Sequence, residues 1–354
     1  MQLCTHPAAP VLVDYNDQDI VDKLTENNKK NVWVSRMIGA DELYLIHVQR
    51  AAGIGLPATL VVKKFQNMNQ APLQVDDNVK NRCKSEVILL ARDCHGNIIG
   101  IIDVIERDEA IMLVYKYLMN GSLDYWLHQR EGADRLLSWP QRRAIAIGVA
   151  KGLCHLHHGG NKPIVHHNIN SKNILLDQNF NAVIASFDAA QMNMVGLDQP
   201  LPIANLPLGN FGYAAPEYAT AASQLTEKVD TYSFGVLMLE LVTGRVANEA
   251  RADGHLAIWA HHFTGLMAKQ VETFESAMEK GIPDQARYME EMATVFRLGV
   301  DCTVVDPKKR PSMRMALKRL RRSCGRDPFR GLLTCYLIYI TNEDLLEVNR
   351  HHQG

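Results

Sequence analysis

Residues 164–177 contain a dense group of polar side chains, namely His166, Asn168, Asn170 and Asn173. A carboxamide donates and accepts hydrogen bonds, but it is neutral and cannot act as a general base at ordinary pH. Between Ile164 and Leu176 this segment contains no carboxylate. We therefore do not expect it to support chemistry that needs a carboxylate base.

A second polar group follows in residues 182–190, where Ser186 and Asp188 flank Phe187. A hydroxyl is a much poorer ligand than a carboxylate for a hard dication such as Mg²⁺. Asp188 is the only carboxylate of this segment.

The elements that position these segments change in type along the chain. The first part predicts strands over residues 32–38, 43–48, 59–65, 98–104 and 110–117, and a helix over 78–91. From residue 121 onward, apolar spacing predicts helices over 122–128, 139–157, 228–242, 288–300 and 312–322. Earlier in the chain, Ile20, Val21 and Leu24 form one face of a short predicted helix. A sheet followed by helices indicates an α+β chain with a small antiparallel β lobe and a larger helical lobe.

Composition fits a soluble globular protein. The chain has 354 residues, 47% hydrophobic and 22% charged, which suits one two-lobed domain or two ordinary domains. Its net charge of −1 gives no indication of a nucleic-acid or membrane-surface partner. The seven cysteines form no C-x-x-C pair, which disfavours a structural zinc site and suits a reducing compartment.

No segment has the features of a signal peptide or a membrane span. The N-terminus lacks a basic region followed by an apolar one. The apolar run over residues 332–340 is too short to cross a bilayer, and we interpret it as a short packed strand.

The two polar segments together resemble the catalytic loop and metal-binding motif of protein kinases, H-R-D-x-x-x-x-N followed by D-F-G. The frame fits without a gap, since His166, Asn173 and Phe187 match the motif. The chemically decisive positions differ: Asn168 replaces the catalytic Asp, Ser186 replaces the metal-binding Asp, and Asp188 replaces the Gly.

Further motifs extend the resemblance over residues 37–322. They are the G-N-F-G-Y-A-A-P-E segment from residue 209, the apolar helix over 229–245, and the short motifs D-P and R-P-S-M within 302–313. The chain is thus similar to plant leucine-rich-repeat receptor-like kinases. The amino-acid sequences of residues 24–28 and 289–296 resemble those of the HAESA-like group of these kinases. The resemblance implies the intracellular kinase-like part of such a receptor.

The resemblance also sets the domain boundaries. It implies an N-terminal flank over residues 1–31, a two-lobed kinase-like domain over 32–322, and a C-terminal tail over 323–354. The N-lobe would cover 32–118 and the C-lobe 119–322.

The Gly-rich phosphate-binding loop of the family is poorly matched here. Ile38 and Gly39 begin it, but Asp41 and Tyr44 stand where two further glycines are expected. We expect a negative charge and a bulky ring to lie where nucleotide phosphates would bind.

Lys63 matches the strand lysine that holds the α- and β-phosphates, and Glu86 matches the helix glutamate that pairs with it. The resemblance implies a Lys63–Glu86 ion pair, which can also serve structurally. The alternative is a surface lysine and an exposed helix glutamate.

Residues 113–118 resemble the hinge between the lobes. By analogy Tyr115 is the gatekeeper, while Lys116 and Leu118 offer backbone groups to an adenine. An edge strand packed against helices is the alternative interpretation.

The substitutions in the catalytic loop imply impaired phosphoryl transfer. Loss of a general base lowers a rate by about 10²–10⁴-fold. Asn170 also replaces the lysine of the motif. Of the family's metal-binding positions, Ser186 has lost the carboxylate and Asn173 remains, but a single amide cannot hold the metal pair. Asp188 substituting for Ser186 is the alternative.

Regulation by phosphorylation is affected as well. His167 replaces the Arg that pairs with a phosphorylated activation loop, and Tyr213 is the only hydroxyl side chain over residues 189–215. The Pro-rich segment 199–207 is either an extended partner surface or an ordinary exposed loop.

Scaffold positions of the family are retained. Glu217 and Arg310 match a buried ion pair, and Asp230 matches the residue that binds the catalytic-loop backbone. The pairs 157–158 and 261–262 are histidines without metal-ligand spacing, and we expect them to be solvated or packed.

Lost chemistry with a retained scaffold predicts a pseudokinase that acts as a binding or allosteric partner of an active receptor kinase or its substrate. The alternatives are an ATP-binding Ser/Thr kinase with residual or atypical activity, and a decayed receptor-kinase copy without a selected role. ATP would bind weakly, and Mg²⁺ is not expected. We expect a cytoplasmic location, reached at the inner face of the plasma membrane through a partner.

Overall fold

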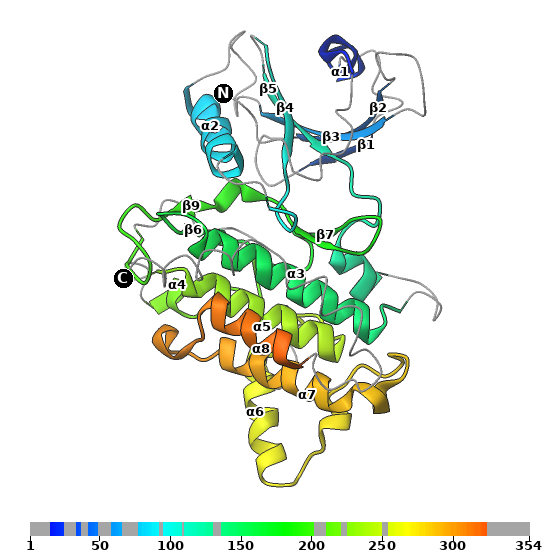
Figure 1. Ribbon diagram of the computed structural model, residues 1–354, viewed down its shortest axis with the longest axis vertical. Helices are drawn as coiled ribbons and strands as arrows, with labels where there is room; N and C mark the ends of the chain where they lie inside the picture. Colours follow the sequence, from blue (N-terminus) through cyan, green and yellow to red (C-terminus); the bar gives the residue numbers. More distant parts are fainter. Residues whose placement is uncertain are drawn as a thin grey trace, which may run out of the picture.

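A computed structural model describes residues 15–24, 33–36, 42–48, 58–65, 77–91, 95–107, 110–129, 136–201, 210–220, 225–249 and 254–323. Figure 1 shows a small upper lobe built on a sheet and a larger lower lobe built from helices. The predicted α+β architecture with two lobes is confirmed.

The upper lobe is a five-stranded antiparallel sheet in the order β1-β2-β3-β5-β4. Its strands are β1 (Trp33–Arg36), β2 (Glu42–Val48), β3 (Ala58–Phe65), β4 (Ile101–Glu106) and β5 (Ile111–Lys116). The prediction for β4 began three residues too early, because Ile98 forms only an isolated bridge with Ile184 of the other lobe. The sheet alternates its side chains between two faces, and a different helix covers each face.

One face of the sheet packs under α1 (Asp17–Leu24). Ile20 and Leu24 are buried there in a cluster with Ile46 and Val62, as the predicted apolar face of this helix requires. Residues of the predicted flank therefore form part of the upper lobe's core.

Tyr44 belongs to this same cluster, which corrects our expectation for its ring. It pairs in register with Val62 on β3, whose side chain faces α1, whereas Lys63 faces the opposite side. Strand alternation thus turns the ring away from the lysine, and it does not lie in a phosphate path. Ile38, Gly39 and Asp41 lie outside the described residues.

The other face of the sheet packs against α2 (Asp77–Ala91) and leads into the main core. This core continues into the helical lobe around α3 (Trp139–His158) and α5 (Lys228–Thr243), whose apolar side chains are almost all buried. One hydrophobic cluster therefore spans the junction of the lobes.

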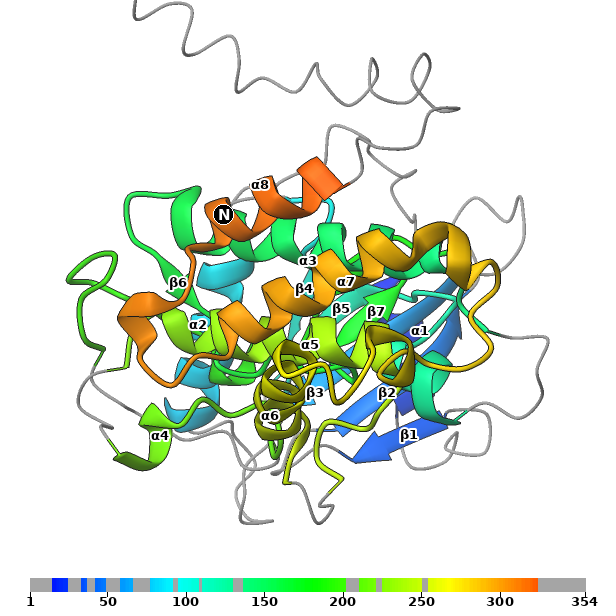
Figure 2. The same ribbon diagram turned by 90° about the horizontal axis from the view of Figure 1, so that it is seen from below.

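The helical lobe also contains α4 (Glu217–Thr220), α6 (Leu256–Ala268), α7 (Gln285–Cys302) and α8 (Met313–Ser323). Figure 2 shows α3, α5, α7 and α8 running side by side when the lobe is seen from below. The helix predicted over 122–128 is present over residues 123–129, with π-helical geometry over Tyr125–Gln129, and α6 was not predicted.

Short strands form the floor of the junction between the lobes. β7 (Ile174–Leu176) pairs with β8 (Ala182–Ile184), and β6 (Ile164–Val165) pairs with β9 (Gln191–Met192). These pairs hold the two polar segments of the sequence beside each other. The run over residues 332–340 lies outside the described residues.

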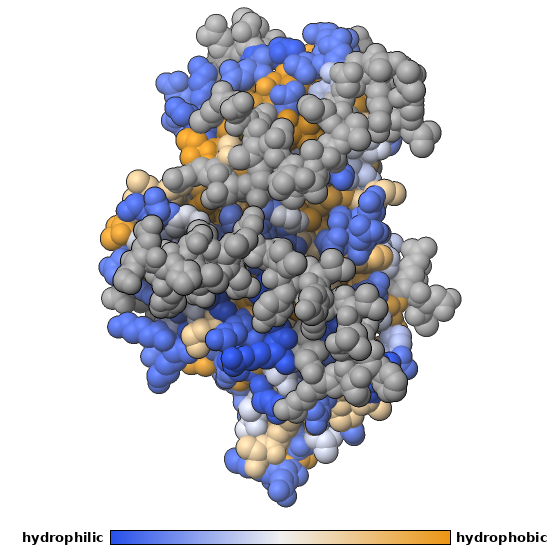
Figure 3. All heavy atoms as spheres, in the orientation of Figure 1, coloured by the Kyte–Doolittle hydropathy of each residue, from blue (hydrophilic) through white to orange (hydrophobic). Residues whose placement is uncertain are grey.

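Hydrophilic side chains predominate on the described part of the helical lobe in the view of Figure 3. The segment predicted as a surface over 199–207 is described only up to Leu201, which is buried and bridges to Leu225. Gln199 and Pro200 are exposed, as both interpretations of this segment expect, and the choice between an ordinary loop and a partner surface stays open.

Candidate functional site: the junction of the lobes

A buried ion pair joins β3 to α2 at the junction. Lys63 Nζ donates a hydrogen bond of 2.6 Å to Glu86 Oε2, and the Tyr115 hydroxyl donates one of 2.7 Å to Glu86 Oε1. All three side chains are buried. The predicted contact between Lys63 and Glu86 is present, and the alternative of exposed partners is wrong.

Strand geometry explains why the lysine points inward. Lys63 and Phe65 are two residues apart on β3 and share the face toward α2, and the ammonium lies 4.6 Å from the Phe65 ring centroid. Burial alone lowers the pKa of Lys63, but the carboxylates of Glu86 and Asp188 outweigh it and raise that pKa overall. The lysine is therefore a fixed positive charge.

Asp188 supplies a second carboxylate to the same ammonium. It lies in the short 3₁₀ turn Phe187–Ala189, and its Oδ1 accepts a hydrogen bond from Lys63 Nζ. Ser186, just before this turn, has φ of 63°, a left-handed conformation that is uncommon for a residue other than glycine. The turn brings the aspartate, and not the serine, to the lysine.

The three asparagines of the catalytic-loop segment bind one another and their own backbone. Asn170 Nδ2 donates to Asn168 Oδ1 at 3.0 Å, and Asn173 Nδ2 donates to the Asn168 carbonyl at 2.8 Å. Asn170 Oδ1 accepts from the backbone N–H groups of Lys172 and Asn173 at 3.0 and 3.1 Å. These amides build the loop, and none of them can accept a proton as a base.

The donor set does not fit a Mg²⁺ ion with a bound triphosphate. A hard dication needs several oxygen ligands, preferably carboxylates. Of the family positions, Asn173 offers a single neutral amide oxygen and Ser186 offers a hydroxyl. The nearby carboxylate of Asp188 is paired with Lys63.

Below the loop, Asp230 of α5 holds the catalytic-loop backbone. Its Oδ2 and Oδ1 accept the backbone N–H groups of His166 and His167, both at 2.8 Å. His157 of α3 lies 2.9 Å from Oδ2 through its Nε2. Burial opposes the charge of Asp230, but the hydrogen bond and positive field of His157 keep its pKa below the ordinary value.

The contact of His157 with Asp230 adds a carboxylate partner that the sequence analysis did not predict. The histidine is packed, as predicted, but as a partner of Asp230. His157 lies four residues after Leu153 on the buried face of α3, and this spacing was the available signal for a buried histidine.

His166 and His167 are buried and uncharged near neutral pH. Burial lowers the pKa of His166 to about 4, and its Nε2 lies 3.1 Å from the Ala185 carbonyl. Burial also lowers the pKa of His167, whose Nδ1 lies 2.7 Å from the Tyr218 hydroxyl. A neutral imidazole in this position gives no cation for a phosphorylated loop.

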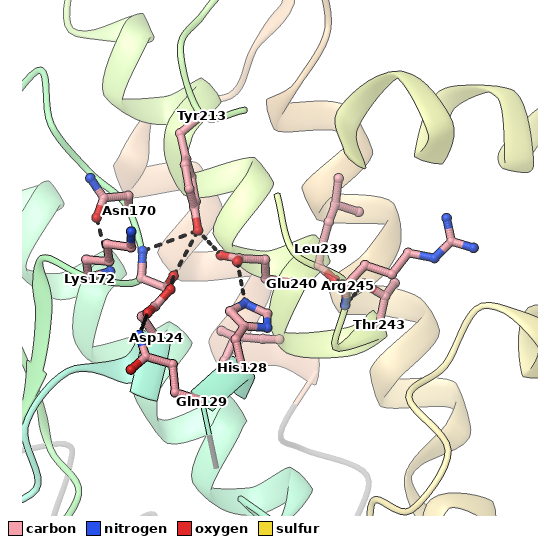
Figure 4. Close-up of polar contacts among 12 residues, drawn as sticks. Asp124, His128, Gln129, Asn170, Lys172, Tyr213, Leu239, Glu240, Thr243 and Arg245 are labelled. Carbon is pink, nitrogen blue, oxygen red and sulfur yellow. Dashed lines mark hydrogen bonds and ion pairs between the residues drawn. The ribbon is translucent and has the colours of Figure 1, made fainter. Parts of the chain in front are cut away.

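Tyr213, the hydroxyl residue of the activation segment, is fixed in a buried network (Figure 4). Its hydroxyl donates to Glu240 of α5 and lies 2.9 Å from the Ser171 hydroxyl. On the other side, His128 Nε2 lies 2.8 Å from Glu240 Oε1. The network joins Tyr213, the catalytic loop and α5, and no pattern in the sequence predicted it.

Glu217 and Arg310 form the bidentate pair that the resemblance implied. Arg310 Nη1 and Nη2 donate to the two carboxylate oxygens of Glu217 at 2.6 and 2.7 Å. Arg310 Nε also donates to the Val304 carbonyl at 2.7 Å. The pair fixes the end of the activation segment to the loop before α8.

The hinge residues lie at the end of β5. Lys116 is the last residue of this strand and pairs in register with Leu60, while the Leu118 carbonyl accepts the backbone N–H of Gly121 at 3.1 Å. The central position of β5 between β3 and β4 excludes the alternative of an edge strand. Binding of an adenine to these backbone groups stays a prediction.

Comparison with known proteins agrees with this architecture. The family described as "Protein kinase domain" matches residues 57–320, more than half of the chain. A protein with two such lobes and this arrangement of lysine, glutamate and catalytic loop has the protein kinase fold. The chain belongs to the protein kinase domain family.

Its similar proteins are named as plant receptor-like kinases. MDIS1-interacting receptor like kinase 1 of Arabidopsis thaliana is 31% identical over 315 residues, which cover 83% of this chain and 30% of that protein. Leucine-rich repeat receptor protein kinase MSP1 of Oryza sativa subsp. japonica is 36% identical over 245 residues, covering 68% of this chain and 18% of that protein. Receptor-like protein kinase HAIKU2 of Arabidopsis thaliana is 28% identical over 318 residues, covering 88% and 31%.

The chain thus spans less than a third of the length of these curated relatives, between 18 and 31%. Among the residues that the structure describes, no helix is both long enough and apolar enough to cross a membrane.

Proposed function

We propose that this chain is a pseudokinase, a kinase domain with impaired phosphoryl transfer that acts by binding a protein partner. The main support for this proposal is the identity of the side chains at the junction of the lobes. Asn168 replaces the base, Ser186 replaces a metal ligand, and the nearby carboxylate of Asp188 is paired with Lys63.

The expected losses of rate are large enough to impair phosphoryl transfer severely. Removing a general base costs about 10²–10⁴-fold, and a missing metal removes charge stabilisation at the transferred phosphate in addition. The retained Lys63–Glu86 pair supplies neither of these contributions, because it positions α2 and carries no base.

A binding role is supported by the order of the scaffold. Asp230 holds the catalytic loop and Glu240 holds Tyr213 through unmodified side chains. Tyr213 and the catalytic loop are thereby held without a phosphate, and we propose that a partner binds the domain in this conformation. We propose an active receptor kinase, or a substrate of one, as that partner, met at the inner face of the plasma membrane. We further propose kinship with the HAESA-like group of receptor kinases.

The second candidate is a Ser/Thr kinase with residual or atypical activity. The intact Lys63–Glu86 pair favours it, because this pair is part of the usual nucleotide site. The third is a decayed copy of a receptor kinase, which folds but has no selected role.

The deciding experiment measures nucleotide binding and transfer on the same preparation. The purified chain is heated with ATP, with and without Mg²⁺, and is incubated separately with labelled ATP and a Ser/Thr substrate. We expect no Mg²⁺-dependent shift of the unfolding temperature and no incorporation of label. Incorporation that disappears in Lys63→Ala would contradict the proposal and establish the second candidate.

Capture of a partner separates the first candidate from the third. An active receptor kinase bound by the folded chain, and not by the heat-denatured chain, supports the binding role. A folded chain that binds none of the receptor kinases of its tissue would indicate a decayed copy.

A further inference from the structure

We propose that Asp188 is a built-in substitute for a nucleotide phosphate, and that it determines which ligands the junction can accept. The proposal rests on the function proposed above and adds a reason why triphosphates are rejected. Its basis is the contact between Asp188 Oδ1 and Lys63 Nζ.

In the group formed by Lys63, Glu86 and Asp188, the Lys63 ammonium is paired with two carboxylates. Its Nζ is 2.6 Å from Glu86 Oε2 and also binds Asp188, so the group carries one positive and two negative charges, a net of −1. A phosphate arriving at this ammonium would meet a site whose charge is already overcompensated. Like charges at short range in a partly desolvated site repel strongly.

The two carboxylates differ in how firmly they are held. The Glu86 side chain is 7% exposed and also accepts the Tyr115 hydroxyl, whereas the Asp188 side chain is 36% exposed. Asp188 therefore lies on the open side of the lysine, the side from which a soluble anion would approach. It occupies the coordination position of the ammonium that a phosphate oxygen would otherwise take.

Backbone geometry directs this residue to the lysine. The left-handed conformation of Ser186 precedes the turn over Phe187–Ala189, and the buried Phe187 ring packs against His166 at 4.7 Å between centroids. With Phe187 held in the core, the next side chain projects toward β3. The proposed ligand class after removal of the carboxylate is a polyphosphate, bound by Lys63 without a metal ion.

The test compares the full chain with Asp188→Asn, which keeps the shape and removes the charge. Affinities for ATP, pyrophosphate and adenosine are measured by calorimetry in the presence of a chelator. We expect Asp188→Asn to bind ATP and pyrophosphate at least tenfold more tightly than the unchanged chain. Adenosine, which has no phosphate, should bind both proteins equally.

The double variant Asp188→Asn with Lys63→Ala should lose the gain in affinity for ATP and pyrophosphate, because Lys63 is the group that binds phosphate once the Asp188 carboxylate is removed. Asp301→Asn is the matched control: this carboxylate is half-exposed and paired with Arg319 away from the junction, and its loss should not change any of the affinities. Asp188→Gly serves as a second variant if Asp188→Asn does not fold.

Equal ATP affinity of the folded Asp188 variants and the unchanged chain would overturn the inference. An equal gain for adenosine would also overturn it, since the carboxylate would then act on the shape of the junction. Failure of the proposed function is distinguishable, because it appears as label transfer by the unchanged chain and does not depend on the ratio of affinities.

Discussion

At the residue scale, the chemistry of the junction depends on a few atoms that change charge and not shape. Asn168 is nearly isosteric with an aspartate, and its Oδ1 accepts a hydrogen bond from Asn170. Asp188 places a charge where the family motif has none. The loop can therefore keep its conformation while the charge pattern around Lys63 is altered.

Restoring the base alone should not restore transfer. Asn168→Asp supplies a proton acceptor, but Ser186 still offers a hydroxyl where the metal needs a carboxylate. We expect label incorporation by Asn168→Asp to stay within tenfold of the unchanged chain. An increase of 100-fold or more, removed again by Lys63→Ala, would show that a metal binds without Ser186.

The pH dependence of stability should reflect His166. Its pKa is about 4 in the folded chain, against an ordinary value of 6.5. Between these values the unfolded chain binds more protons, so the contribution of His166 is fully present above pH 6.5 and is lost as pH falls to about 4. The loss amounts to about 3 kcal/mol. Burial raises the pKa values of Glu86 and Glu240, and their protonation offsets part of it.

Nuclear magnetic resonance of the histidine rings provides the direct measurement. We expect the His166 ring to stay neutral down to about pH 4. A His166 ring that titrates near pH 6.5 in the folded chain would contradict this assignment.

At the element scale, buried polar side chains on α5 hold the activation segment and the catalytic loop. Asp230 at its first turn binds the loop backbone, and Glu240 near its end binds Tyr213 and His128 (Figure 4). α5 ends at Gly244, where φ of 64° and the close approach of Glu279 require a glycine. One helix thus holds Tyr213 and the backbone of the catalytic loop without phosphorylation.

The ion pair that closes the activation segment should be essential for stability. Arg310→Met leaves the Glu217 carboxylate buried without its partner, which costs about 3–5 kcal/mol. The matched control is Arg319→Met, since the Arg319–Asp301 pair is about half-exposed and should contribute about 0–1 kcal/mol. Urea unfolding measures both, and equal effects of the two substitutions would contradict the buried role of Arg310.

At the scale of the whole molecule, the upper lobe is covered on both faces of its sheet, by α1 on one side and α2 on the other (Figure 1). The Tyr15 hydroxyl, just before α1, donates a hydrogen bond of 3.2 Å to Asp103 of β4. The lobe therefore includes residues before its first strand.

Truncating the buried face of α1 should weaken this lobe. Ile20 is fully buried, so Ile20→Ala should lower the free energy of unfolding by about 2–5 kcal/mol. Gln18→Ala on the exposed side of the same helix should change it by less than about 0.5 kcal/mol. If Ile20→Ala had as little effect as Gln18→Ala, α1 would not be part of the folded core.

The sequence by itself determined the class of fold, because apolar periodicity and motif spacing are local properties of the chain. It also placed Lys63 with Glu86 and Glu217 with Arg310, since the resemblance supplied those long-range pairs. It did not place Tyr44, because the face of a strand residue depends on register with β3. The sequence also did not predict the contact of His157 with Asp230 or the hydrogen bond from Tyr213 to Glu240.

Only the tertiary structure decided that Asp188 binds Lys63, from a position 125 residues later in the chain. The side-chain direction of Asp188 depends on a left-handed residue before it and on a buried phenylalanine beside it. Contacts of this kind depend on how two lobes pack, and no local pattern of residues encodes that packing.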